Sequence, residues 1–375
     1  MKVKLIICTS FLRTQDHTDP FYDLIVRLID ECDWINWQVF VWCRDVKCGY
    51  PPEKIDDYHC LEVCGRWLYR FCRLFAWHVP TWKLYRLFGY LLRPFFAKKF
   101  AADIIITQAG LFADLFAGLL PDTRIVDVQH GVIYSRHNGY FGSDGRLLEC
   151  YRLTKHREFW VYGQGYADCF FRHPDNVKDL KGRVKIIGDV LSHKEVSSDI
   201  RDTIVISGQF KPECSQQCLL DEVDALRRFL TDIQISFGSK YNILIKHHPR
   251  YKRIQALDVL YREFPFFSET KRSWESLYGR MKVHVTFSST VVFDAASNGI
   301  PSCLLDPPND DPVLENIFWR DDYHYPFYGK NLKEILELSE NPETAIEIKS
   351  WFKRFYEPFE NKRCLELLTE KGKLK

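Results

Sequence analysis

The sequence lacks the features that mark membrane-spanning, secreted and nucleic-acid-binding proteins. No stretch approaches the roughly 18 uninterrupted apolar residues of a spanning helix. The N-terminus carries charge and then only a brief apolar run before Arg13 and Asp16, which is too short for the core of a signal peptide and typical of a first strand. The formal net charge of +2 and the absence of any RNA- or DNA-binding motif argue against nucleic acid as a partner.

The chain also lacks a paired-cysteine motif. Its 13 cysteines include no Cys-x-x-Cys pair. The closest spacings are Cys60 with Cys64 and Cys214 with Cys218, and no histidine stands at zinc-ligand spacing beside either pair. We therefore expect free thiols and a cytoplasmic protein rather than a disulfide framework or a zinc site.

Acidic residues are missing from residues 64–102, which contain twelve aromatic and eight basic residues. The basic residues are Arg66, Arg70, Arg73, Lys83, Arg86, Arg93, Lys98 and Lys99. Basic aromatic helices without acids are attracted to anionic membrane surfaces, at about 1 kcal/mol per Lys or Arg near the surface. The alternative is a pair of helices that face the core and keep their basic side chains in water.

The length of 375 residues exceeds the size at which one core keeps growing, so we expect two domains. Apolar strand-like runs alternate with helical runs in both halves, which predicts an α/β fold with parallel sheets and right-handed crossovers. We expect an N-terminal Rossmann-like domain at 1–195 with the basic aromatic insertion 64–102, and a second Rossmann-like domain at 196–345. The segment 346–375 should form a C-terminal helix that packs back on the first domain.

The predicted strands and helices follow from these runs. The strands are Leu5–Cys8, Trp37–Trp42, Asp103–Thr107, Arg124–Val128, Glu158–Tyr162, Val184–Ile187, the run that begins at Thr203, Ile243–Ile245 and Val283–Phe287. The main helices of the second half are Leu219–Phe237, Ile254–Glu263, Val291–Ser297, Leu332–Ser339 and Thr344–Leu368.

Polar residues follow three strands of the second domain. In a parallel sheet the strand C-termini share one edge, where ligands bind, so these residues should converge there. The hydroxyls of Ser288, Ser289 and Thr290 precede a helix whose free N–H groups attract anions, although Ser289 or Thr290 could merely cap that helix. We assign nucleotide or phosphate binding to Gly208, Gln209, Lys246, Pro249, Arg250, Ser288, Ser289, Thr290 and Asp294.

Polar residues also follow strands of the first domain. The Arg124–Val128 strand ends in Gln129-His130-Gly131, and residues 135–145 read as a long polar loop of the kind that carries function. We place Gln129, Gly131, Asp16, His17, Arg136 and His137 on the acceptor side of the predicted site.

Three ordered motifs carry a resemblance to a known family. Gln129-His130-Gly131, Lys246-His247-His248-Pro249 and Ser288-Ser289-Thr290 resemble the motifs of GT-B glycosyltransferases. The nearest patterns are those of bacterial sialyltransferases, capsular polysaccharide transferases and CDP-glycerol glycerophosphotransferases. The chain departs from the sialyltransferases in having Ser143-Asp144-Gly145 where they carry a doubly acidic motif. The donor therefore stays open among CMP-, CDP- and UDP-linked groups.

The resemblance implies a GT-B enzyme with two Rossmann-like domains that face each other across a cleft. It would move a sugar from a nucleotide-sugar to a surface polysaccharide or lipid-linked glycan, as in capsule or lipopolysaccharide biosynthesis. The alternatives are a CDP-glycerol-type phosphopolyol transferase and an inactive nucleotide- or glycan-binding protein. It would need no cofactor and no obligatory metal, and it could sit on the inner face of the cytoplasmic membrane through 64–102.

Candidate catalytic roles fall on four residues, and the resemblance supplies the role of the first. His248 matches the histidine of the His-Pro motif, which donates a hydrogen bond or proton to the leaving phosphate. His130 would take a proton from the attacking hydroxyl, with Asp144 and Asp16 as rival bases. A strand-end histidine can instead simply bond a neighbouring carbonyl, so a structural role stays open for both histidines.

Overall fold

The computed structural model divides the chain into two units. Unit 1 comprises Met1–Ser192 and Phe355–Lys375, and unit 2 comprises His193–Arg354. The sequence analysis placed the first domain boundary at 195 and the second at 345, whereas the structure places them at 192 and 354. The residues that the structure describes are 3–9, 24, 35–41, 58–60, 70, 74, 79–108, 110, 112–189, 196, 201–208, 216–248, 255–305 and 317–370.

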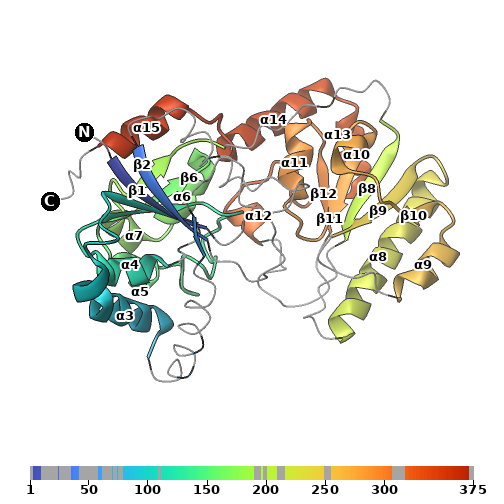
Figure 1. Ribbon diagram of the computed structural model, residues 1–375. Coiled ribbons are helices and arrows are strands. Elements are labelled where there is room, and N and C mark those ends of the chain that lie inside the picture. Colours follow the sequence, from blue (N-terminus) through green and yellow to red (C-terminus); the bar gives the residue numbers. More distant parts are fainter. Residues whose placement is uncertain are drawn as a thin grey trace. The chain divides into compact units, whose positions relative to one another are not determined.

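Unit 1 is built on a seven-stranded parallel sheet with the strand order β3-β2-β1-β4-β5-β6-β7. Figure 1 labels β1, β2 and β6 of this sheet. The strands are β1 Val3–Thr9, β2 Ile35–Val41, β3 Tyr58–Cys60, β4 Ile104–Gln108, β5 Arg124–Val128, β6 Arg157–Val161 and β7 Val184–Ile186. The helices are α3 Thr81–Phe96, α4 Ala113–Leu119, α5 Glu149–Arg152, α6 Gln164–Phe171, α7 Pro174–Asp179 and α15 Asn361–Thr369.

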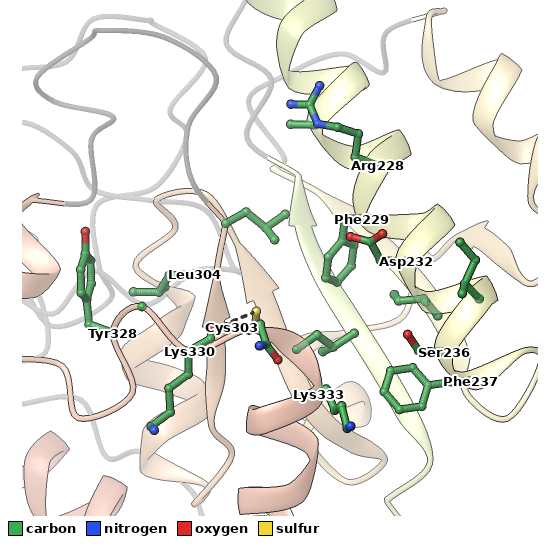
Figure 2. Close-up of a pocket in the computed structure, with 17 residues that line it drawn as sticks. Arg228, Phe229, Asp232, Ser236, Phe237, Cys303, Leu304, Tyr328, Lys330 and Lys333 are labelled. Carbon is green, nitrogen blue, oxygen red and sulfur yellow. Dashed lines mark hydrogen bonds between the residues drawn. The ribbon is translucent and has the colours of Figure 1, made fainter.

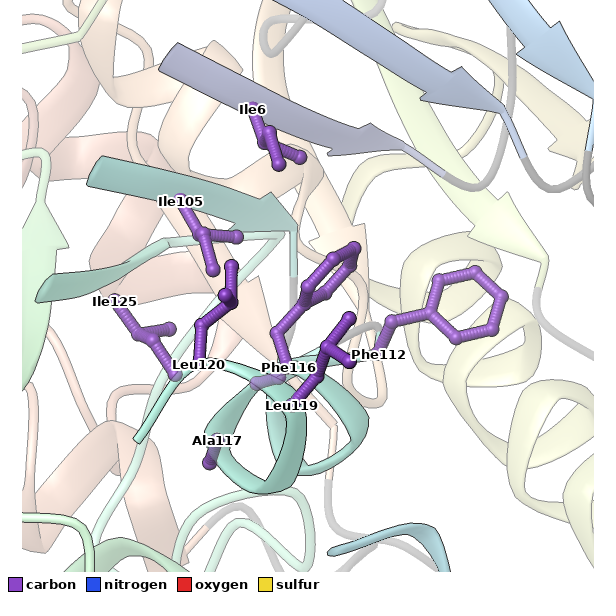
Figure 3. Packing of buried hydrophobic residues seen from close by; sticks show 9 residues of the cluster. Ile6, Ile105, Phe112, Phe116, Ala117, Leu119, Leu120 and Ile125 are labelled. Carbon is purple, nitrogen blue, oxygen red and sulfur yellow. The ribbon is translucent and has the colours of Figure 1, made fainter. Parts of the chain in front are cut away.

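The core of unit 1 forms where α4 covers the middle of this sheet. Ile6, Ile105 and Ile125 come from three adjacent strands and face Phe116 and Leu120 at the α4 helix (Figure 3). All five are buried. The strand residues are β-branched, which suits a sheet that is covered by helices.

Unit 2 has a five-stranded parallel sheet with the order β10-β9-β8-β11-β12. Its strands are β8 Thr203–Gly208, β9 Asn242–His247, β10 Phe267–Glu269, β11 Met281–Thr286 and β12 Ser302–Leu304. Its helices are α8 Gln216–Phe237, α9 Leu257–Glu263, α10 Trp274–Tyr278, α11 Val291–Ser297, α12 Ile317–Asp321, α13 Leu332–Ser339 and α14 Pro342–Phe355, the last of which reaches the unit boundary.

Two short helices of unit 2 have the predicted bounds. Helix α11 spans Val291–Ser297, and Gly299 after it adopts φ +69°, a conformation that favours glycine. Helix α13 spans Leu332–Ser339 and begins with a reciprocal capping box between Asn331 and Glu334. Local signals fix these helices because the residues that start and stop them lie within one turn.

The prediction of one helix over Thr344–Leu368 is wrong. The structure has two helices there, α14 and α15, and Pro358 lies between them. Proline lacks an amide hydrogen and disfavours helix in the preceding residue. The intervening segment joins unit 1, where the amide of Asp189 donates to the carbonyl of Glu357 at 2.7 Å. The sequence also gave no prediction for β3, β10 and β12, each three residues long and each at a sheet edge.

Candidate functional site

Three predicted strand ends of unit 2 lie side by side. Strands β9, β8 and β11 are adjacent, and Gly208 pairs in register with His247 while Ser207 pairs with Thr286. The amide of His248 donates to the carbonyl of Gly208 at 3.0 Å, which holds the two chain segments together just past the strands. The strand order thus brings the Gly208, His248 and Ser288–Thr290 segments to one edge of the sheet.

The hydroxyl-rich turn after β11 divides into structural and accessible groups. Ser289 is only 3% exposed; its amide donates to Thr286 Oγ1 at 3.0 Å and its Oγ accepts from the Val291 amide at 3.3 Å. Thr290 is exposed and makes no capping hydrogen bond, and Ser288 is half-buried. Ser289 therefore builds the turn, whereas the side chain of Thr290 is open to a ligand.

The ammonium group of Lys246 already contacts other residues of unit 2. Its ammonium donates to the carbonyl of Arg272 at 2.6 Å and lies 5.6 Å from the ring centroid of Trp274. Burial lowers the pKa of Lys246, and the nearby Glu275 carboxylate opposes this by raising it. Contact with a phosphate at the sheet edge would require Lys246 to leave the Arg272 carbonyl.

The remaining predicted residues of this edge are only partly described. His248 is half-buried at the end of β9, and Asp294 is half-buried in the first turn of α11. The Asp294 carbonyl accepts hydrogen bonds from the side chains of Ser297 and Asn298, at 2.7 and 3.0 Å. The predicted ligands Gln209, Pro249 and Arg250 lie outside the described residues.

In unit 1, Gln129 holds the turn that presents His130. Gln129 is 1% exposed; its amide nitrogen donates to the Gly131 carbonyl at 2.7 Å and its amide oxygen accepts from the Tyr162 amide at 3.0 Å. Gly131 adopts φ +73°, which a larger residue would resist. His130 itself is exposed between them. Gln129 thus acts as a positioning residue, and His130 is the accessible group.

The predicted loop 135–145 is an ordered turn anchored by its own aromatic residues. Tyr140 and Phe141 are buried, and the Tyr151 hydroxyl donates to the Gly139 carbonyl at 2.6 Å. Asp144 is exposed, and its carboxylate accepts from the Arg146 amide at 3.0 Å. The same carboxylate can therefore either fix the turn or accept a substrate proton.

Two further predicted acceptor residues lie in this turn. Arg136 is exposed. His137 accepts a hydrogen bond from the Gly139 amide on Nδ1 at 3.1 Å and packs against Tyr134 and Tyr140. Burial lowers the pKa of His137, so its ring is neutral at neutral pH. Asp16 and His17 lie outside the described residues.

Sequence reasoning missed a buried charged cluster beneath the unit 1 strand ends. Arg157 on β6 is 1% exposed and pairs with Asp127 on β5 at 2.7 Å. The second oxygen of Asp127 accepts from the Gly110 amide at 2.7 Å and from Thr107 Oγ1 on β4 at 3.4 Å. Burial raises the pKa of Asp127, and Arg157 opposes that rise. An aspartate inside the apolar run 124–128 was the available signal.

A second buried cluster, also missed, crosses three strands of unit 2. The ring of His284 on β11 contacts Ser207 Oγ on β8 at 2.7 Å and Ser302 Oγ on β12 at 2.9 Å. Burial lowers the pKa of His284 to about 3, so the ring is neutral. The Tyr325 hydroxyl accepts from the Ser302 amide at 2.7 Å and extends the chain of hydrogen bonds.

A groove of about 710 Å³ runs along helix α8 of unit 2 (Figure 2). It lies between α8 and the 328–333 segment, with Phe229 and Leu304 among its apolar walls and Arg228, Asp232 and Lys333 among its charged ones. Leu304 pairs in register with Thr286, the last residue of β11, so the groove reaches the strand ends. Its volume lies in the range of small-molecule sites.

Two absences hold for the described part of the chain. No described helix is long and apolar enough to cross a bilayer. No group of three or more His, Cys, Asp or Glu side chains is placed to hold a metal ion among the residues that the structure describes.

Neither the known protein families nor the curated proteins contain a match to the sequence. Solved structures are similar in fold along nearly the whole chain. The UDP-GlcNAc 2-epimerase from Neisseria meningitidis bound to UDP-GlcNAc has a TM-score of 0.52 at 10% identity, over 98% of this chain and 99% of the epimerase. MurG from Acinetobacter baumannii has a TM-score of 0.52 at 11% identity, over 98% and 99%.

A third similar structure is the glycotransferase of kitacinnamycin, with a TM-score of 0.52 at 10% identity over 94% of this chain and 95% of that one. Identities this low establish the fold alone. The similarity to these three structures and the two all-parallel sheets together show that the chain has the GT-B fold, built from two Rossmann-like α/β domains.

Proposed function

We propose that the protein is a glycosyltransferase that moves a sugar from a CMP-, CDP- or UDP-linked donor to a surface polysaccharide or lipid-linked glycan. One observation carries the proposal: three adjacent strands of unit 2 end at one sheet edge in a glycine, a histidine pair and a hydroxyl-rich turn. Ligands of open α/β sheets bind outside such edges. The UDP-GlcNAc bound by the Neisseria meningitidis epimerase supports a nucleotide-sugar as the ligand.

In unit 2 we assign the donor to the edge formed by Gly208, His248 and Thr290, and its base or sugar to the adjoining groove. A leaving nucleotide gains negative charge as the glycosyl bond breaks. Hydrogen-bonding groups that point at its phosphate therefore lower the activation barrier of the transfer. His248 would supply a hydrogen bond or proton, and the exposed Thr290 hydroxyl a further hydrogen bond. Lys246 would add charge after exchanging its bond to Arg272 for one to phosphate. These groups would replace a metal ion.

In unit 1 we assign the acceptor to the edge around Gln129, His130 and Gly131. His130 is exposed and would take the proton of the attacking hydroxyl, because histidine can serve as a base near neutral pH. Asp144 is the competing base. Gln129 would keep His130 in place through its two buried hydrogen bonds.

The proposed setting is the biosynthesis of capsule or lipopolysaccharide on the inner face of the cytoplasmic membrane. A lipid-linked acceptor would explain the acid-free segment 64–102. Three alternatives would use the same nucleotide-binding residues. They are transfer of a phosphopolyol from a CDP-linked donor, binding without turnover, and epimerisation of the nucleotide-sugar. The similar Neisseria meningitidis structure suggests the last of these.

The first test is thermal denaturation in the presence of CMP, CDP, UDP and GDP. A nucleotide that binds only the folded protein raises the melting temperature, by an amount equivalent to about 2.7 kcal/mol at a hundredfold excess over its dissociation constant. Incubation of the matching nucleotide-sugar without acceptor then separates epimerisation from transfer. If no nucleotide raises the melting temperature, the proposal is wrong.

The second test uses the two histidines once the donor is known. His130→Ala and His248→Ala should each lower turnover by about a hundredfold, the usual scale of acid-base catalysis. His130→Ala should leave nucleotide affinity unchanged, because His130 belongs to unit 1. Near-normal turnover of His130→Ala would transfer the role of base to Asp144, for which Asp144→Asn is the matched variant.

A further inference from the structure

We propose that helix α3 docks on an anionic lipid bilayer by inserting an apolar face, while neighbouring basic side chains bind the lipid phosphates. The inference extends the proposed membrane location, on which it rests, and it is independent of the nucleotide chemistry of unit 2. The sequence suggested attachment through charge. The structure adds a built apolar surface to that charge.

The apolar face lies on the outer side of α3. Leu87, Leu91 and Phe95 follow each other at intervals of four residues, and Tyr90 lies beside them, so the four side chains share one side of the helix. The exposed fractions are 53% for Leu87, 56% for Leu91, 77% for Phe95 and 62% for Tyr90. Contiguous exposed apolar groups of this kind mark interaction surfaces, and tyrosine suits the boundary between lipid and water.

Helix α3 is mounted firmly on unit 1 through its opposite side. Gly89 lies against Gly118 of α4 so closely that a Cβ atom on either glycine would collide with the backbone of the other helix. Arg86 also donates to the Asp114 carboxylate of α4 at 3.0 Å and to the Thr154 hydroxyl. Turning the apolar face inward would break these contacts, so the face stays outward.

The exposed charge is concentrated at one end of the helix. Arg93, Lys98 and Lys99 are exposed, and no carboxylate in the described part of the chain pairs with them. Lys83 and Arg86, by contrast, pair with Glu149 and Asp114 at 3.6 and 3.0 Å. Three cations thus stand beside the apolar face, which is the composition of helices that lie in a membrane interface.

Charge decides between a bilayer and a second copy of the chain as the occupant of this face. In a two-fold dimer through α3, parallel helices would bring Arg93, Lys98 and Lys99 close to the same residues of the partner. Antiparallel helices would bring them to the N-terminal end of the partner's helix, whose first turn holds no acidic residue. The segment 64–102 contains no acidic residue to neutralise them. An anionic bilayer supplies hydrocarbon for the apolar face and phosphates for the cations at once.

The test is flotation with vesicles of phosphatidylcholine alone and of equal parts phosphatidylcholine and phosphatidylglycerol. The apolar variant is Leu91→Ser with Phe95→Ser, and the charge variant is Lys98→Gln with Lys99→Gln. Ile346→Ser on α14 is the matched control, because Ile346 is 70% exposed but lies in unit 2 and outside the groove. Melting temperatures of all variants establish that each is folded.

We expect the wild-type chain and Ile346→Ser to float with the anionic vesicles. The apolar variant should lower the partition coefficient about ten- to a hundredfold at both low and high salt, because apolar transfer does not depend on charge screening. The charge variant should lower it about tenfold at low salt only.

Three results would overturn the proposal. Wild-type chain that stays unbound at low salt excludes the bilayer. Unchanged binding of the apolar variant excludes insertion and leaves charge alone. A lipid-free dimer that dissociates in the apolar variant assigns the face to a second copy. Nucleotide-induced stabilisation is recorded in parallel: its absence from every protein counts against the proposed function, and it leaves this surface untouched.

Discussion

The two parallel sheets each bury a polar cluster across three adjacent strands, but one cluster is charged and the other is neutral. In unit 1, a hydrogen bond from Thr107 to Asp127 and an ion pair from Asp127 to Arg157 join β4, β5 and β6. In unit 2, Ser207 and Ser302 flank a neutral His284 across β8, β11 and β12. A buried ion pair depends on both partners, whereas a neutral histidine depends on pH. Loss of one charged partner should therefore destabilise unit 1, and acid should destabilise unit 2.

The two buried clusters also bond to different segments outside the strands. The carboxylate of Asp127 holds the Gly110 amide, so the charged cluster fixes the chain after β4 at the sheet edge. The His284 cluster connects instead to Tyr325, on the segment after α12. Unit 1 thus uses buried charge to shape the proposed acceptor edge, and unit 2 uses uncharged hydrogen bonds to hold its sheet to a following segment.

The largest expected effect comes from breaking the charged cluster. Arg157→Met should lower the free energy of unfolding by about 3–5 kcal/mol, because it leaves Asp127 buried without its partner. Urea denaturation measures the loss. Adding Asp127→Leu should recover part of it, since both charges are then removed. A loss of no more than about 1 kcal/mol for Arg157→Met would mean that Asp127 is neutral in the folded chain.

The neutral cluster should respond to acid. Above its ordinary pKa of 6.5, His284 is neutral in both the folded and unfolded chain, so it contributes no pH dependence. Below that pH the unfolded chain gains a proton that the folded chain takes up only near its pKa of about 3. The free energy of unfolding should then fall by about 1.4 kcal/mol per pH unit, or about 2 kcal/mol by roughly pH 5.

His284→Asn isolates this contribution, because carboxylates elsewhere also titrate in acid. The variant should be less stable at neutral pH, yet its stability should decline less steeply between about pH 6.5 and 5. Equal slopes for both proteins in denaturant titrations would show that the folded chain protonates His284.

The smallest expected effect separates structure from binding at the edge of unit 2. Ser289→Ala should lower stability by about 1 kcal/mol through the loss of a buried hydrogen bond, and leave nucleotide affinity nearly unchanged. Thr290→Val should leave stability unchanged and weaken nucleotide binding about tenfold, since its hydroxyl is exposed. Titration calorimetry that finds the reverse order would place the ligand contact at Ser289.

The sequence by itself determined the local elements of this protein. β-Branched runs predicted the strand Arg124–Val128 with the observed bounds, N-cap and glycine signals predicted α11, and the helical pattern of the tail predicted α13. The polar ends of the strands were visible in the same way. These features follow from interactions among residues within a few positions of each other, which is why no knowledge of the fold was needed. The longest helical prediction, Thr344–Leu368, failed at Pro358, where the chain returns to unit 1.

Only the tertiary structure decided which of these residues meet and which are accessible. The order β9-β8-β11 made three strand ends neighbours, and packing buried Ser289 while leaving Thr290 exposed. His284 and Ser207 lie 77 positions apart in the sequence. The outward face of α3 likewise depends on the contact of Gly89 with α4. Burial and pairing across such distances are set by the packing of whole elements, and a local pattern carries no information about that packing.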